Sequence, residues 1–234
     1  MNADSYQTAC VILPVYRQAD HVAGVIEDYL EAVKKLPIPV NFLLVPNGGE
    51  AATEAACAGL EKQYESVRSL PISAGGWGRA VRAGLAAAEE DLVCYTNSSR
   101  TSSADLVLLL LYGIANPGLV IKANRKIRDG AVRRFGSLFY NLECRALYDL
   151  PMWDVNGTPK LFPKTMTPLL ELKRDDDLID LEFNVICRQQ DYRMLEVPIL
   201  STRRHGGKST TNWRTAFKLY TGAWRLKNSL GKDG

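Results

Sequence analysis

Short apolar runs alternate with helix-like stretches in the first half of this 234-residue chain, and this alternation restricts the fold more than any other feature. Apolar runs typical of strands buried on both faces lie at residues 10–15, 40–45, 67–72, 92–96 and 119–123. Stretches with apolar residues at helical spacing lie between them, at residues 20–33, 50–64, 79–89 and 104–115. Strands that alternate with helices of this length predict a mostly parallel sheet with helices on both faces.

The pattern changes after residue 125. The spacing of apolar residues predicts one long amphipathic helix, then a strand, a helix and a strand, at residues 128–148, 160–162, 177–190 and 194–200. No linker or internal repeat divides the chain, so we expect one α/β domain with a basic C-terminal extension. Asp20 precedes the first helical stretch, and we expect it to cap that helix.

Composition excludes several classes of protein. Hydrophobic residues make up 46% and charged residues 24% of the chain, which is typical of a globular protein and not of a disordered one. No apolar run is long enough to span a bilayer, and no basic segment precedes the first one, so we predict a cytoplasmic protein without a signal peptide. Five dispersed cysteines without a C-x-x-C pair argue against disulfides and structural zinc.

The charge is distributed unevenly. Residues 1–120 contain 8 Lys and Arg against 13 Asp and Glu, whereas residues 121–234 contain 21 against 13. The second half is therefore the part expected to face an anion, although basic solvent-exposed helix faces would give the same asymmetry. No aromatic and basic motif typical of nucleic-acid binding accompanies it, so we expect no nucleic-acid partner.

Three common motifs are absent. Gly207-Lys208-Ser209 resembles the end of a phosphate-binding P-loop, but position 202 lacks the required first glycine. Gly76-Trp77-Gly78 lacks the third glycine of a dinucleotide-binding turn. With only His21 and His205 in the chain, a histidine-based triad or histidine-rich metal site is not expected.

Several short strings, taken in order, resemble a known family. The string VILPVY at residues 11–16 resembles the opening of family 2 glycosyltransferases. Six more strings follow in order: GRAVRAGL at 78–85, KANR at 122–125, RRFGS at 133–137, DVNGTPKLF at 154–162, EVP at 196–198 and RHGGKS at 204–209. Together they resemble the polyprenyl-phosphate glycosyltransferase branch, similar to dolichyl-phosphate mannose synthase, over residues 9–210.

This resemblance implies a GT-A fold in residues 1–210, followed by a basic amphipathic helix in residues 211–234. It implies an inverting transfer of a sugar from a nucleotide-sugar donor to an acceptor such as a polyprenyl phosphate or another small molecule. The alternative is a GT-A-fold binding or scaffold protein that has lost catalysis.

The chain departs from the family pattern at three acidic positions. Asn97-Ser98-Ser99 stands where the family carries the D-x-D motif that binds a divalent metal. Residues 46–49 (PNGG) replace a D-D-G-S string, and Arg17-Gln18 replaces Asn-Glu. Mg²⁺ and Mn²⁺ favour carboxylate oxygens, so we predict no cofactor and no metal-binding residues.

The resemblance assigns roles to individual residues. Arg125 and Arg204 are the candidates that neutralise the leaving diphosphate, and Asp154 is the candidate base. The residues expected to contact the donor are Pro14, Tyr16, Asn47, Gly78, Arg79, Asn97, Ser99, Arg100, Arg133, Ser137 and Lys208. For Tyr16 and Asn47 the alternative is purely structural, because an asparagine in a turn often stabilises its own backbone.

The C-terminal segment carries an aromatic stripe among basic residues. Trp213, Phe217, Tyr220 and Trp224 recur at helical spacing over residues 211–228. This pattern is typical of a helix that lies on a membrane surface, which would make the protein peripheral to the inner face of the membrane. Docking on the domain itself or on a homodimer partner remains an equal alternative.

Overall fold

The structure is a computed structural model, and it describes residues 6–125, 131–200, 221–224 and 227, with the side chains of 131–135 and 137 left out. Its strands are β1 (Ala9–Val15), β2 (Val40–Pro46), β3 (Val67–Ser69), β4 (Leu92–Tyr95), β5 (Val120–Arg125), β6 (Lys160–Pro163) and β7 (Met194–Ile199). Its helices are α1 (Val22–Val33), α2 (Ala51–Gln63), α3 (Trp77–Ala87), α4 (Ser103–Ala115), α5 (Ala131–Tyr148), the 3₁₀ helix η1 (Thr167–Leu169) and α6 (Ile179–Gln189).

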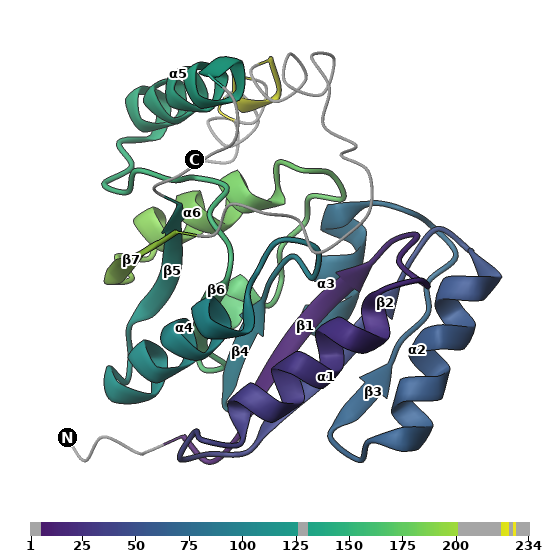
Figure 1. Cartoon of the computed structure of the whole chain (residues 1–234). Helices are drawn as coiled ribbons and strands as arrows, with labels where there is room; N and C mark the ends of the chain where they lie inside the picture. The colour runs from purple at the N-terminus through teal and green to yellow at the C-terminus, as the bar shows by residue number, and fades with distance from the viewer. Residues whose placement is uncertain (1–5, 126–130, 201–220, 225–226, 228–234) are drawn as a thin grey trace.

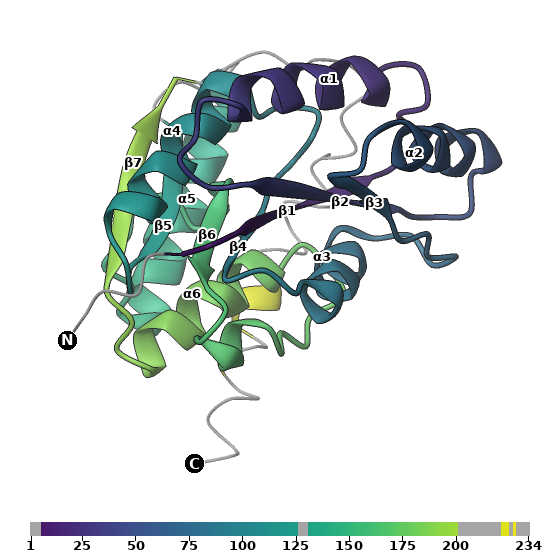
Figure 2. The same cartoon turned by 90° about the horizontal axis from the view of Figure 1, so that it is seen from below.

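In the described part of the chain, seven strands form one sheet in the order β3-β2-β1-β4-β6-β5-β7. β6 runs antiparallel to both of its neighbours, and every other pair is parallel. Figure 2 shows α1, α2 and α4 on one face of the sheet and α3 and α6 on the other. The predicted α/β architecture, a mostly parallel sheet between helices, is therefore confirmed.

The central strand β1 is buried on both faces, as its uninterrupted apolar sequence predicts. Val11 and Leu13 pack in the core under α1 and α4, whereas Cys10 and Ile12 point to the core under α3 and α6. A third cluster joins α5 to α6 through Tyr140, Cys144 and Leu181. Because strand residues alternate between faces, one strand contributes to both layers of core.

Close packing of α3 on the sheet depends on a glycine. A Cβ atom on Gly84 would lie 2.2 Å from Ile12 Cγ2, well inside van der Waals contact. The bare backbone of Gly84 therefore lets α3 approach β1 more closely than any other residue would allow.

The start of α1 differs from the prediction. Asp20 does not cap the helix, and His21 occupies the capping position without a side-chain hydrogen bond to the helix amides. Instead Asp20 Oδ1 contacts His21 Nδ1 at 2.6 Å, and the backbone amides of His21 and Val22 donate to the carbonyl of Gln18. A backbone turn therefore satisfies amides that a side-chain cap would otherwise bind.

The predicted C-terminal helix lies mostly outside the described residues. Within it, residues 221–224 and 227 are helical, and Ala223 packs in the cluster between α5 and α6. No helix in the described part of the chain is both long and apolar enough to cross a membrane.

Candidate functional site

The carboxyl ends of β1, β2, β4 and β5 lie along one edge of the sheet, because these strands are mutually parallel (Figure 1). Polar side chains follow each of these ends: Tyr16, Asn47, Asn97 and Arg125. The sheet order therefore brings together residues that are 109 positions apart in sequence. Ligands of open α/β sheets bind along this edge, which makes it the candidate site.

Tyr16 stands at the end of β1, and its side chain is 40% exposed. Its ring lies against the backbone of Gly48, where an added Cβ would be only 2.8 Å from Tyr16 Cε2. Gly48 also has a φ of +89°, in the region that favours glycine. The Tyr16 ring therefore packs on the backbone of the turn at residues 46–49, because Gly48 has no side chain there, and it lies beside the carboxyl ends of the strands. Arg17 covers part of that ring, with its guanidinium carbon 5.3 Å from the ring centre.

Asn47 is buried, and its amide group bonds to the surrounding backbone. Its Nδ2 donates to the carbonyls of Val15 (3.0 Å) and Val45 (3.2 Å), while its Oδ1 accepts from the amide of Gly76 (3.2 Å). These bonds tie the ends of β1 and β2 to the loop before α3. The geometry favours the structural alternative for Asn47, because the atoms expected to read a base already have partners.

The loop after β4 is stabilised by its own side chains. Asn97 Oδ1 accepts from both the backbone amide (3.0 Å) and the hydroxyl (2.6 Å) of Ser99. The hydroxyl of Ser98 donates to Gln18 (2.7 Å) and weakly to the carbonyl of Pro14 (3.4 Å). Pro14 is thus a buried strand residue that holds this loop through its carbonyl. The loop lies beside the end of β1, and Arg100 follows at its partly buried end.

The start of α3 is pinned to the acidic segment before α6. A Cβ on Gly78 would lie within 2.6 Å of backbone atoms of residues 174–176, so glycine permits this contact. Arg79 and Arg82 both pair with Asp175, the Arg79 Nε lying 3.4 Å from Asp175 Oδ2. Both arginines are exposed and pair at the surface, where such contacts contribute little stability.

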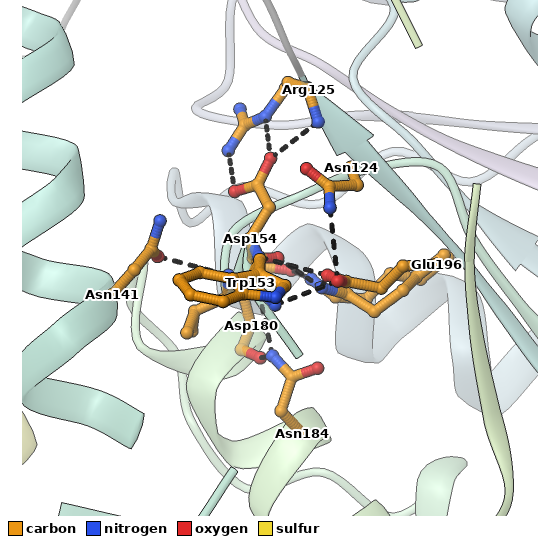
Figure 3. A network of polar contacts seen from close by, with 11 residues as sticks. Asn124, Arg125, Asn141, Trp153, Asp154, Asp180, Asn184 and Glu196 are labelled. Carbon is orange, nitrogen blue, oxygen red and sulfur yellow. Dashed lines mark hydrogen bonds and ion pairs between the residues drawn. The ribbon is translucent and has the colours of Figure 1, made fainter. Parts of the chain in front are cut away.

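Arg125 and Asp154 form a two-pronged ion pair at the end of β5. Arg125 Nε and Nη2 each donate to one carboxylate oxygen at 2.8 Å, and the Arg125 backbone amide donates to Oδ2 at 3.0 Å (Figure 3). The Asp154 side chain is only 3% exposed, whereas that of Arg125 is 27% exposed. A forked pair of this kind fixes the guanidinium plane, and the arginine remains the member accessible from solvent.

Glu196 in β7 binds groups on both segments that carry this pair. Its carboxylate accepts from the backbone amides of Trp153 (2.9 Å) and Asp154 (3.0 Å), from Lys122 Nζ (3.1 Å) and from Asn124 Nδ2 (3.2 Å). Lys122 also donates to the Asp154 carbonyl. Burial lowers the pKa of Lys122, and the neighbouring Glu196 and Asp154 oppose that effect.

A second buried lysine lies beside the first, at the paired position of the adjacent strand. Lys160 in β6 pairs with Lys122 in the strand register and is fully buried, and its ammonium is bound by Asp180 of α6. Asp180 also accepts from the hydroxyl of Tyr95 (3.1 Å) and the indole of Trp77 (3.2 Å). Trp77 therefore faces the core side of this site, where its indole is bound by Asp180.

The described network balances its charges. Three cationic side chains, Lys122, Lys160 and Arg125, alternate with three carboxylates, Asp154, Asp180 and Glu196. Balance of this kind is needed because an unpaired charge in a protein interior is strongly unfavourable.

Lys160 predicts a measurable dependence of stability on pH. Burial lowers the pKa of Lys160 to about 8, against the raising effect of Asp180. Between this value and the ordinary lysine pKa the unfolded state binds more protons, so this group makes the free energy of unfolding rise with pH. We expect a rise of about 1 kcal/mol per pH unit from pH 8 to 9.5.

Urea unfolding followed by circular dichroism in a reducing buffer measures this effect. Buried cysteines and tyrosines titrate in the opposite direction, so the wild type is compared with the Lys160→Met/Asp180→Asn double variant. The difference in unfolding free energy, wild type minus variant, should rise with pH. A difference that stays flat over this range would contradict the assignment.

The sequence contained a signal for the charged residues of this network to which no role had been assigned. Lys122 and Lys160 each interrupt a buried apolar strand, and a charge in such a strand needs a buried partner; Glu196 lies in the partly exposed edge strand β7. Arg133 and Ser137 lie on α5, but their side chains are outside the described part of the structure. Arg204 and Lys208 also lie outside the described residues, so their placement stays a prediction.

Comparison with known proteins supports the fold. No family model and no curated protein matches the chain. Among solved structures it is similar to glucosyl-3-phosphoglycerate synthase from Mycobacterium tuberculosis in complex with Mn²⁺, UDP and phosphoglyceric acid, with a TM-score of 0.71 and 16% identity over 96% of this chain and 80% of that chain. The complex of the same enzyme with phosphoglyceric acid gives a TM-score of 0.72 and 13% identity, covering 96% of this chain and 81% of that chain.

The chain therefore has the GT-A fold of glycosyltransferases. The branch similar to dolichyl-phosphate mannose synthase, named from the sequence strings, is not distinguished by these structures. The neighbour was crystallised with Mn²⁺, UDP-glucose and phosphoglyceric acid in a further structure, at a TM-score of 0.71 and 15% identity over 96% of this chain and 81% of that chain.

The residues of this chain do not fit a divalent cation at the corresponding loop. Asn97 and Ser99 offer neutral oxygens, and Asn97 Oδ1 already accepts two hydrogen bonds. No group of three or more His, Cys, Asp or Glu suited to a metal occurs among the residues that the structure describes. Hard cations favour carboxylates, so the donor set here disagrees with a metal site of the family kind.

Proposed function

We propose that this protein transfers a sugar from a nucleotide-sugar donor to an acceptor, with arginine charge in place of a bound metal. The observation that carries the proposal is the Arg125–Asp154 pair, a cation fixed and partly exposed at the binding edge of a GT-A sheet. A leaving nucleoside diphosphate gains negative charge as the glycosidic bond breaks, and a preorganised cation stabilises it.

The spacing of the strands suits such a donor. β1 and β5 are three interstrand steps apart in the sheet, or about 14 Å. This separation is comparable with the length of an extended nucleoside diphosphate. We therefore place the nucleoside beside Tyr16, the diphosphate across the loop at residues 97–100 with its sugar-bearing phosphate toward Arg125, and the sugar next to that phosphate. Arg79, Arg133, Arg204 and Lys208 would supply further positive charge, and Ser137 would offer a hydroxyl for a hydrogen bond to the phosphate.

Asp154 acts in this scheme by positioning Arg125. Its two carboxylate oxygens both accept from the guanidinium and the side chain is buried, which leaves it poorly placed to remove a proton from an acceptor. A phosphate acceptor is already anionic and needs no base. The proposal therefore pairs an inverting single displacement with a phosphate-bearing acceptor, either a polyprenyl phosphate or a small phosphorylated molecule.

The proposed division of the chain suits such an acceptor. We propose that residues 1–210 form the GT-A domain and that residues 211–234 form a basic helix that contacts a membrane surface or a second copy of the chain. Small phosphorylated acceptors are bound by the M. tuberculosis neighbour, as the phosphoglyceric acid complexes show for that protein.

A second function is favoured by a specific observation. The side-chain amide of Asn47 binds the backbone of neighbouring segments, that of Asn97 binds Ser99 in its own loop, and neutral residues stand at three positions that are acidic in the family. A GT-A-fold protein that binds a ligand without catalysis would show this arrangement. Binding accompanied by no turnover of any donor would support this alternative.

The primary test is calorimetry with nucleoside monophosphates, nucleoside diphosphates and nucleotide sugars, in the presence and absence of Mg²⁺ or Mn²⁺. We expect binding of one nucleoside diphosphate with a Kd that changes less than twofold when EDTA is added, because residues 97–99 offer no carboxylate. A loss of binding with EDTA that Mn²⁺ restores would contradict the metal-free mechanism. The absence of binding to every nucleotide would overturn the proposed function.

A further inference from the structure

Glu196 is a heavily hydrogen-bonded carboxylate in the network beneath the site. It accepts four hydrogen bonds between 2.9 and 3.2 Å, and its side chain is 15% exposed. Two of the donors are side chains from the neighbouring strand β5, and two are the consecutive backbone amides of Trp153 and Asp154 (Figure 3). One carboxylate therefore joins the sheet to the loop that precedes β6.

The loop is held at both ends of the Asp154 residue. Glu196 binds its amide, while its carbonyl accepts from Lys122 and from the backbone of Gly157 (3.0 Å). A Cβ on Gly157 would lie 2.0 Å from the carbonyl oxygen of Ala123, so the loop also packs directly on β5. With its backbone fixed in this way, Asp154 directs its carboxylate at the guanidinium of Arg125.

The same contacts hold the preceding side chain at the surface. Trp153 is 55% exposed, and the guanidinium carbon of Arg145 lies 3.9 Å from the centre of its ring. The ring therefore stands at the protein surface on a backbone that Glu196 fixes. The environment of the Trp153 ring is therefore a probe of the position of this loop.

We infer that Glu196 is a positioning residue of the proposed site, which sets the loop of Trp153 and Asp154 and thereby aims Arg125 at the sheet edge. The inference rests on the proposed function. Stability alone is a weak explanation for this arrangement, because buried ion pairs often stabilise less than apolar residues of the same size. The four hydrogen bonds to Glu196 instead fix the position of the loop that carries Asp154. Asp154 in turn orients Arg125, the residue that carries the proposed chemistry.

Replacing Glu196 by glutamine tests the inference. Glutamine keeps the size of the side chain but has one acceptor oxygen, so it cannot accept all four hydrogen bonds. The matched control is Glu90→Gln at the opposite edge of the sheet. Glu90 is also buried, and it accepts from Asn41 (3.0 Å), Arg68 (3.1 Å) and a backbone amide (2.9 Å).

The first readout needs no ligand. The chain is labelled with 5-fluorotryptophan, and the ¹⁹F resonance of Trp153 is assigned from the Trp153→Phe variant. We expect Glu196→Gln to shift or broaden this resonance and Glu90→Gln to leave it unchanged. An unchanged Trp153 resonance in Glu196→Gln would overturn the inference.

The second readout is the Kd of the tightest-binding nucleotide among UDP, GDP, ADP and CDP, together with kcat and KM for its sugar nucleotide. We expect Glu196→Gln to weaken binding or slow kcat at least 10-fold, about 1.4 kcal/mol, and Glu90→Gln to change both less than twofold. Equal effects of the two variants would show that Glu196 serves stability alone.

Two outcomes are separated by design. If the wild type binds no nucleotide, the proposed function fails, while the fluorine spectra still decide whether Glu196 positions the loop. If Glu196→Gln does not fold, the Lys122→Met/Glu196→Gln variant keeps the charge balance and is carried through both readouts with the same expected results.

Discussion

Replacing Arg125 by alanine is expected to slow sugar transfer by about 10²-fold or more. This is the effect of removing one preorganised donor that stabilises developing negative charge, about 2.7 kcal/mol. The Arg125 guanidinium is held in one plane by Asp154, so its charge is preorganised at the end of β5. Initial rates with the nucleotide sugar that binds in calorimetry measure the change. Arg204→Ala is expected to show a loss of similar size.

The same substitution also leaves the Asp154 carboxylate buried without its partner, which is costly for folding. The Arg125→Gln/Asp154→Asn variant removes both charges and separates the two effects, since it should fold and remain slow. Arg188→Ala is the surface control, because Arg188 pairs with exposed Asp149 and not with the Arg125–Asp154 pair. Arg125→Ala with wild-type turnover at full folding would show that the catalytic assignment is wrong.

Replacing Lys160 by methionine is expected to lower the free energy of unfolding by about 3 to 5 kcal/mol, because it leaves Asp180 buried and uncompensated. Most domains are stable by only about 5 to 15 kcal/mol, so the variant would be close to unfolding. The Lys160→Met/Asp180→Asn double variant should recover a large part of the loss, since it leaves no buried charge and the asparagine oxygen can accept from Trp77 while its amide nitrogen donates to the Tyr95 hydroxyl. Urea unfolding followed by circular dichroism measures both variants.

The control for this prediction is a surface pair. Lys34 and Glu31 lie one helical turn apart on α1 and are both exposed, so Lys34→Met should change stability by less than about 1 kcal/mol. If Lys160→Met were no more destabilising than Lys34→Met, the buried pair would not hold the sheet to α6 as the structure indicates.

The two predictions concern different layers of one network. Asp180 joins β6 to α6 within the core, and Asp154 joins the loop before β6 to the end of β5. Variants in the first pair should therefore act on stability, and charge-balanced variants in the second pair should act on turnover.

The local pattern of apolar residues was enough to predict most elements. Strand β1 has apolar residues on both faces and α4 has them at helical spacing, so the conformation of each segment is predicted by its own sequence. The positions of Tyr16, Asn47, Asn97 and Arg125 at the ends of strands followed from the same pattern. Their arrangement along one edge then required only that the strands be parallel.

The roles of individual residues could not be predicted in the same way. Asn47 and Asn97 were expected to face a ligand, yet their amides bind nearby backbone, because the turns that contain them leave carbonyl and amide groups to be satisfied. Glu196 was recognised only as part of the EVP string at residues 196–198. Its role was not predictable, because its four hydrogen-bond partners come from β5 and from the loop before β6, which are distant in sequence.

The sequence by itself determined the alternation of strands and helices, the burial of β1 on both faces and the edge on which the polar residues gather, since these depend on periodicity within short segments. Tertiary structure decided that β6 runs antiparallel between β4 and β5, and that Lys122 and Lys160 lie opposite each other in that pairing. It also decided which carboxylate neutralises which cation. Strand order and register join segments far apart in the chain, and their choice depends on the packing of the whole domain rather than on any local pattern.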